Sequence, residues 1–113
     1  MEFIRKKTKA SSAYERDFII KCTQDKRFVV SSKIIEKLNI NVETQALMFG
    51  WKNNQLHLIV EEKADDNFHL SKQEGFTHRF RSSELYEYLV VKLKLEKGAF
   101  TLKLKENNIL ELV

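Results

Sequence analysis

The stretch RFVVSSKIIEKL, residues 27–38, decides the fold, because residues 79–89 repeat its pattern as RFRSSELYEYL. In each stretch a short strand-like segment runs into a Ser-Ser pair and then an apolar stripe at helical spacing. Hydroxyl side chains at such a start are suited to accept hydrogen bonds from the free amides of the first helical turn. The residues that match at one constant offset are Ser31, Ser32, Glu36 and Leu38 with Ser82, Ser83, Glu87 and Leu89.

A second pair of matching stretches follows each helix pattern. KNNQLHL at 52–58 is similar to ENNILEL at 106–112. In both, two Asn residues separate alternating apolar runs, and Asn tolerates the positive φ of a two-residue hairpin turn. The order strand, Ser-Ser helix, strand, Asn-Asn turn, strand therefore predicts an internal repeat over 17–62 and 67–113.

Alternation of apolar and polar residues is the main secondary-structure signal in this proline-free chain. The fold class we predict is mainly β with two short helices, arranged as a tandem pseudo-two-fold repeat. A unit of about 45 residues is too small to bury its own core, so the halves must interlock. The strands we expect are 18–22, 27–30, 46–51, 55–60, 67–70, 76–81, 99–105 and 109–113.

Length and composition indicate one folded domain behind a charged tail. The chain has 113 residues, 42% of them hydrophobic, and residues 1–16 carry five Lys/Arg against two Glu. We therefore expect a flexible basic tail at 1–16 and a single domain at 17–113, either a monomer with an internal pseudo-dimer or a homodimer. No stretch resembles a signal peptide or a membrane span, which favours a cytoplasmic protein. The lone Cys22 is expected to be a buried structural thiol.

Residues 25–62, DKRFVVSSKIIEKLNINVETQALMFGWKNNQLHLIVEE, resemble the AbrB/SpoVT-type swapped-hairpin DNA-binding domain. The resemblance is carried by an Arg, an apolar strand, a short helix, a polar stretch and a two-stranded hairpin, and the second copy shows it more weakly. It implies an interlocked swapped-hairpin barrel that binds DNA as a transcriptional regulator or antitoxin-like module. Four positions depart from the family pattern: Ser31 replaces a Pro, Asn39 replaces a Gly, and the family's basic helical pair falls on Ile35 and Glu36.

Clustered Lys and Arg are the side chains that contact the phosphates of duplex DNA. The first copy offers Lys21, Lys26 and Arg27, and the second copy offers Arg79 and Arg81. The tail adds Arg5, Lys6, Lys7 and Lys9. A further series, Lys92, Lys94, Lys97, Lys103 and Lys105, alternates with Leu and is expected on the polar face of a hairpin, where lysines also protect a sheet edge.

A protein-interaction module that keeps the fold without binding DNA is the alternative function. Two observations favour it: the charges of residues 17–113 nearly cancel, and Ile35 and Glu36 stand where the family has a basic pair. Tyr86 and Tyr88 cannot both lie at the centre of the second apolar stripe, so one is expected to be exposed to a partner. The scattered His57, His69 and His78 match no metal site or nucleophile-base pair, so we expect no enzyme, no metal and no cofactor.

Overall fold

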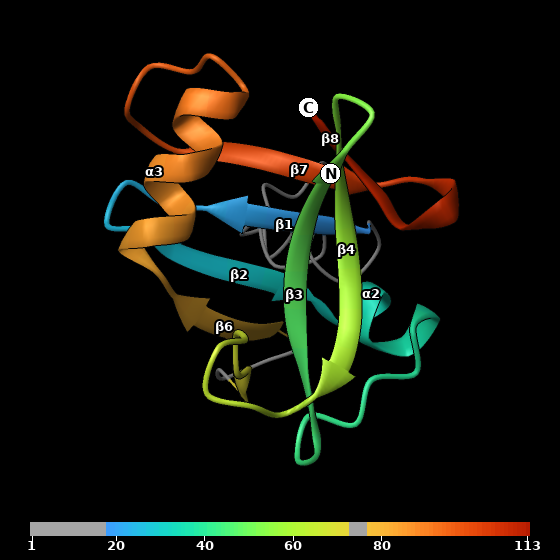
Figure 1. Ribbon diagram of the computed structural model, residues 1–113. Helices are drawn as coiled ribbons and strands as arrows, with labels where there is room; N and C mark the ends of the chain where they lie inside the picture. Colours follow the sequence, from blue (N-terminus) through green and yellow to red (C-terminus); the bar gives the residue numbers. More distant parts are fainter. Residues whose placement is uncertain (1–17, 73–76) are drawn as a thin grey trace, which may run out of the picture.

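The computed structural model describes residues 18–72 and 77–113, and these form two successive runs of strand, strand, helix, strand, strand (Figure 1). In the first run the elements are β1 (Ile19–Cys22), β2 (Arg27–Ser31), α2 (Ser32–Lys37), β3 (Gln45–Lys52) and β4 (Gln55–Glu62). In the second they are β5 (Ser71–Lys72), β6 (Thr77–Arg81), α3 (Ser83–Lys92), β7 (Phe100–Leu104), the 3-10 turn η1 (Glu106–Asn108) and β8 (Ile109–Leu112).

All eight strands form one antiparallel sheet in the order β3-β4-β8-β7-β1-β2-β6-β5, which curls into a half-barrel (Figure 1). A mainly β fold with two short helices, as expected, is confirmed. Hairpins from the first and second runs alternate along this order. A single bridge between Leu47 of β3 and Phe68, just before β5, brings the two ends of the sheet toward each other.

Both Asn-Asn pairs lie in hairpin turns, but only the first makes the two-residue turn that the sequence predicts, between Lys52 and Gln55. The second turn is the three-residue η1, because Leu104 pairs with Leu110 and the amide of Lys105 bonds to Ile109. Asn53 and Asn54 have φ values of 55° and 59°, and Asn107 and Asn108 have 61° and 59°. Asn tolerates this left-handed region better than other residues with a side chain. The first pair joins β3 to β4, and the second joins β7 to β8 within η1.

The two helices end alike but begin differently. Asn39 and Lys94 both have positive φ, and each helix closes with the paired backbone hydrogen bonds of a Schellman motif. Ser82 Oγ accepts from the amide of Leu85 at 3.0 Å, as expected for a helix start. The same expectation for Ser31 is wrong: its hydroxyl makes no capping bond, is fully buried and accepts from the amide of Ile19 at 3.4 Å.

Two other local expectations need correction. The strand expected at 67–70 is limited to the Phe68 bridge, and the paired segment is Ser71–Lys72. The expected series of Lys92, Lys94, Lys97, Lys103 and Lys105 does not lie on one face of a hairpin. Helix α3 continues to Lys92 and the chain turns at Lys94, so Lys103 is the one member of the series that lies on β7. Leu89 and Val90 are buried by the longer helix. The alternation of Lys and Leu at residues 92–95 is too short to distinguish a strand from the end of a helix, which explains the error.

Aromatic rings from both runs form the centre of the core. Phe28 and Phe80 stack with centroids 4.8 Å apart and an interplanar angle of 4°, and Phe68 stacks on Phe80 at 5.0 Å. Phe49 meets Phe68 edge-on at 5.7 Å. Aromatic pairs at such separations add stability beyond the burial of their area. The core therefore joins the two runs, and it includes the fully buried Cys22, as expected.

Candidate nucleic-acid interface

The outer face of β1, β2 and β6 carries the strand arginines and Lys21 that the sequence singles out. Alternation determines this placement, because Ile20 and Cys22, Phe28 and Val30, and Phe80 point into the core. The residues between them point outward. Within 18–72 and 77–113 no helix is long and apolar enough to cross a membrane.

Arg27 and Arg81 are direct register partners across the β2–β6 pair. Side chains at directly opposite positions of an antiparallel pair have Cβ atoms about 4.5–5.5 Å apart, and like charges there destabilise the pair. Arg79 lies two residues along β6, opposite Val29 on β2 and Ser71 on β5. Three guanidinium groups therefore share one small area of the sheet.

A surface hollow of about 330 Å³ lies among these arginines. Arg27, Arg79 and Arg81 line it together with Ser71 and Phe80. We call this set the arginine face. Sequence reasoning missed Ser71, because its place opposite Arg79 depends on pairing between β5 and β6 and no local pattern predicts it. Guanidinium groups in such a cluster are suited to bidentate hydrogen bonds with phosphate oxygens.

A carboxylate of the described residues lies beside the cluster. Asp25 lies 3.1 Å from Arg27 and accepts a hydrogen bond from the hydroxyl of Thr23. That hydrogen bond and the charges of Arg27 and Arg81 hold the pKa of Asp25 below its ordinary value. Arg79 and Arg81 form no ion pair with any residue of the described ranges. The described residues of the cluster therefore carry more positive than negative charge.

Lys21 and Lys26 differ in how they relate to the arginine face. Lys21 lies on β1 opposite Val29, in the same cross-strand row as Arg79. Lys26 occupies the turn before β2 with a φ of 68°, and its ammonium group points to α3, 3.5 Å from Glu87 and 5.9 Å from the ring centre of Tyr86. The structure therefore groups Lys21 with the arginines and separates Lys26 from them. The tail positions Arg5, Lys6, Lys7 and Lys9 lie outside the described residues.

The chain matches no family model, no curated protein and no solved structure in the three comparisons. Any functional assignment must therefore come from the chemistry of its surfaces.

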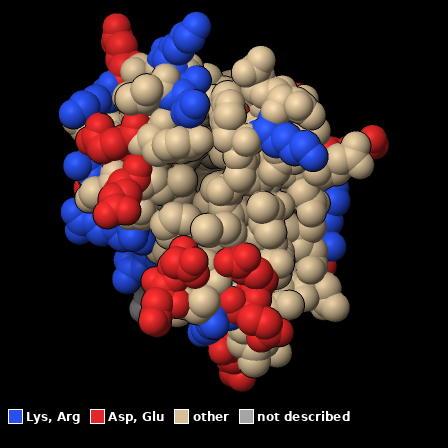
Figure 2. Space-filling view, viewed as in Figure 1, with Lys and Arg blue, Asp and Glu red and all other residues tan. Residues whose placement is uncertain are grey.

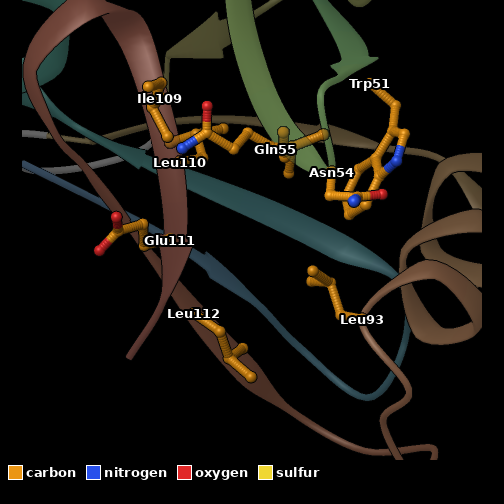
Figure 3. Close-up of a pocket in the computed structure, with 9 residues that line it drawn as sticks. Trp51, Asn54, Gln55, Leu93, Ile109, Leu110, Glu111 and Leu112 are labelled. Carbon is orange, nitrogen blue, oxygen red and sulfur yellow. The ribbon is translucent and has the colours of Figure 1, made fainter.

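A second hollow, of about 230 Å³, lies where β4 and β8 separate after only two paired positions. Figure 3 shows Trp51, Asn54 and Gln55 from the β3–β4 hairpin on one side and Glu111 and Leu112 from β8 on the other. Among the described residues, Glu111 is the one titratable group of its lining, so these residues offer neither an acid-base pair nor a basic patch.

The thiol of Cys22 and the imidazole of His69 lie outside both hollows. Burial, with a smaller contribution from Asp25, raises the pKa of the Cys22 thiol to about 12, so the thiolate is scarce at neutral pH. His69 lies 2.7 Å from the carbonyl oxygen of Ala64. No group of three or more His, Cys, Asp or Glu in residues 18–72 and 77–113 is placed to hold a metal ion.

Proposed function

We propose that this protein binds duplex DNA, with the arginine face as its main phosphate-contacting surface. The observation that carries the proposal is the register pair of Arg27 and Arg81, with Arg79 beside them around one hollow. Two arginines at directly opposite positions cost stability in the free protein. An anion bound between the two guanidinium groups offsets this loss of stability. Anion binding therefore explains why two arginines occupy directly opposite positions.

A polyanion fits the surface better than a single small anion. The outward residues run in a row from Lys21 through Val29 to Arg79, across three adjacent strands. Neighbouring strands are about 4.8 Å apart, so the row extends over about 10 Å. A nucleic-acid backbone presents several phosphates over that distance, and most protein–DNA hydrogen bonds go to phosphate and sugar. Arg5, Lys6, Lys7 and Lys9 are proposed to add contacts from the tail.

The arrangement of hairpins supports an AbrB-like tandem fold as the scaffold of this function. Hairpins of the first and second runs alternate in the sheet, as an interlocked pair of repeats requires. Leu56 and Leu110, each two residues after its Asn-Asn pair, are register partners in the β4–β8 pair. We infer that the chain contains an internal version of the swapped-hairpin dimer and acts as a small transcriptional regulator or antitoxin-like module.

Fluorescence anisotropy with a labelled 20-base-pair duplex at about 50 mM salt tests the proposal. The wild-type protein is expected to bind, and Arg27→Ala/Arg79→Ala is expected to weaken binding at least about tenfold, because two charge-assisted contacts are lost. Lys52→Ala/Lys63→Ala is the matched control, since it removes two exposed charges at the ends of the β3–β4 hairpin. Absence of binding by the wild type, or equal weakening in both variants, would contradict the proposal.

A further inference from the structure

A second surface has the opposite character to the arginine face. It is a groove of about 280 Å³ between β3, the segment before β5, and α3. Met48, Phe49, Phe68, Leu85 and Tyr88 form its apolar lining, and Asp66 and Glu84 complete it. We call it the Tyr88 groove. Its volume lies just below the range of about 300–1,000 Å³ typical of small-molecule sites, so it suits one anchoring side chain of a larger partner.

The floor of the groove is continuous with the core and is therefore preformed. Phe68 stacks on Phe80, and Phe49 meets Phe68 edge-on. Leu85 is buried on the inner side of α3. Side chains held by core packing lose little conformational freedom when a ligand arrives, which lowers the entropic cost of binding.

Tyr88 lies at the mouth of the groove and is not part of the buried core. Its neighbour Tyr86 is buried and bonded to the backbone of Gly98, whereas 43% of Tyr88 is exposed. This answers which of the two tyrosines faces outward. Exposed tyrosines beside a preformed apolar pocket are typical anchors of protein interfaces. On its other side, the ammonium group of Lys92 lies 5.7 Å from the centre of the Tyr88 ring.

The charge around the groove selects the kind of partner. Asp66 and Glu84 are exposed, and neither forms an ion pair within the described ranges. Figure 2 shows acidic side chains gathered over the segment that follows β4, where Glu62, Asp65 and Asp66 are all exposed, below a broad uncharged surface over β3 and β4. Such a rim repels nucleic acid and attracts Lys and Arg.

We propose that the Tyr88 groove docks a partner protein through a short segment in which one large apolar side chain is flanked by basic residues. The apolar side chain fills the space between Phe68 and Tyr88, and the flanking cations meet Asp66 and Glu84. A second copy of this chain offers a poor match, because a symmetric contact would bring two acidic rims together. This interaction is separate from DNA binding and does not depend on it.

The test is an NMR titration of the full-length, nitrogen-15-labelled protein with a synthetic peptide, acetyl-Gly-Lys-Lys-Leu-Trp-Lys-Lys-Gly-amide. Saturable amide shifts are expected around the lining residues of the Tyr88 groove. Tyr88→Ala and Asp66→Lys/Glu84→Lys are each expected to weaken peptide affinity at least about tenfold. Val91→Ala is the matched control, because Val91 lies on the same helix and is 73% exposed.

Three results would overturn this inference. The first is no saturable shift with the basic peptide, or shifts scattered away from the groove. The second is equal affinity for a control peptide in which Glu replaces every Lys. The third is concentration-dependent self-association of the wild type that Tyr88→Ala abolishes, since that identifies a second copy as the occupant. Duplex DNA affinity of Tyr88→Ala is measured in parallel and is expected to equal that of the wild type.

Discussion

Phe28 and Phe80 stack face to face at 4.8 Å from directly opposite positions on β2 and β6. The same register makes Arg27 and Arg81 partners on the outer face, one residue away on each strand. Side chains alternate between the faces of a sheet, so an aromatic pair inside places a charged pair outside. The core contact that joins the two halves of the chain thus also assembles the arginine face.

Arg81→Glu is expected to make the protein more stable and a poorer DNA binder. The change converts a like-charge pair with Arg27 into an opposite-charge pair, which stabilises the sheet by about 0.2–1 kcal/mol at low salt. Urea unfolding at low and high salt measures this, and the gain should shrink as salt screens the charges. Loss of stability in Arg81→Glu at low salt would show that the attraction between Arg81 and Asp25 outweighs the repulsion between the two arginines.

Phe28→Leu and Phe80→Leu are each expected to lower the free energy of unfolding by about 1–3 kcal/mol, because each leaves unfilled space in the aromatic core. Both should retain a single cooperative transition, since the stack joins the two halves. The double variant should lose less than the sum of the single changes, because the two rings share one contact. Val91→Ala, at an exposed position, serves as control. Two separate unfolding transitions would contradict a shared core.

Tyr86→Phe is expected to destabilise the protein by about 1–3 kcal/mol through loss of a paired hydrogen bond. The hydroxyl of Tyr86 accepts from the amide of Gly98 at 2.7 Å and donates to its carbonyl at 3.1 Å. Chemical denaturation compares this variant with Tyr88→Phe, which removes an exposed hydroxyl from the same helix and should leave stability unchanged. Similar losses in the two variants would show that the bond to Gly98 contributes little.

Stability is expected to fall as the pH drops below about 6.5, the ordinary pKa of an imidazole, partly through His78. Burial, and then the charge of Lys72, lower the pKa of His78 in the folded protein, and its buried Nδ1 has no hydrogen-bond partner among the described residues. The unfolded chain therefore binds this proton more readily, so falling pH favours unfolding. Urea midpoints between pH 7.5 and 5.5 should decline less in His78→Gln. An unchanged decline would rule out this role of His78.

Local features of the fold were predictable from the sequence, because their causes are local. The Asn-Asn turns follow from the tolerance of Asn53 and Asn107 for positive φ. Burial of Cys22 follows from alternation along its strand. The role of Ser31 was not predictable, because its hydroxyl accepts a hydrogen bond from the amide of Ile19 on β1. That partner is brought close by tertiary structure and not by the local sequence.

The sequence predicts which residues form the candidate site but not how they are placed relative to one another. Alternation indicates that Arg27, Arg79 and Arg81 point away from the core. That Arg27 and Arg81 are direct partners depends on the pairing of strands about 50 residues apart in the chain, which no local pattern determines. The same holds for Lys26, whose ion pair with Glu87 depends on where α3 packs. Long-range register is thus what the structure adds to the sequence.

The salt dependence of DNA affinity is the most direct test of the central claim that the arginine face contacts phosphates. Each phosphate contact adds about 0.9 to the slope of the logarithm of affinity against the logarithm of salt concentration. Arg27→Ala/Arg79→Ala should therefore bind with a slope about 1.8 less steep than that of the wild type, while Lys52→Ala/Lys63→Ala keeps the wild-type slope. Equal slopes for the wild type and Arg27→Ala/Arg79→Ala would contradict the claim.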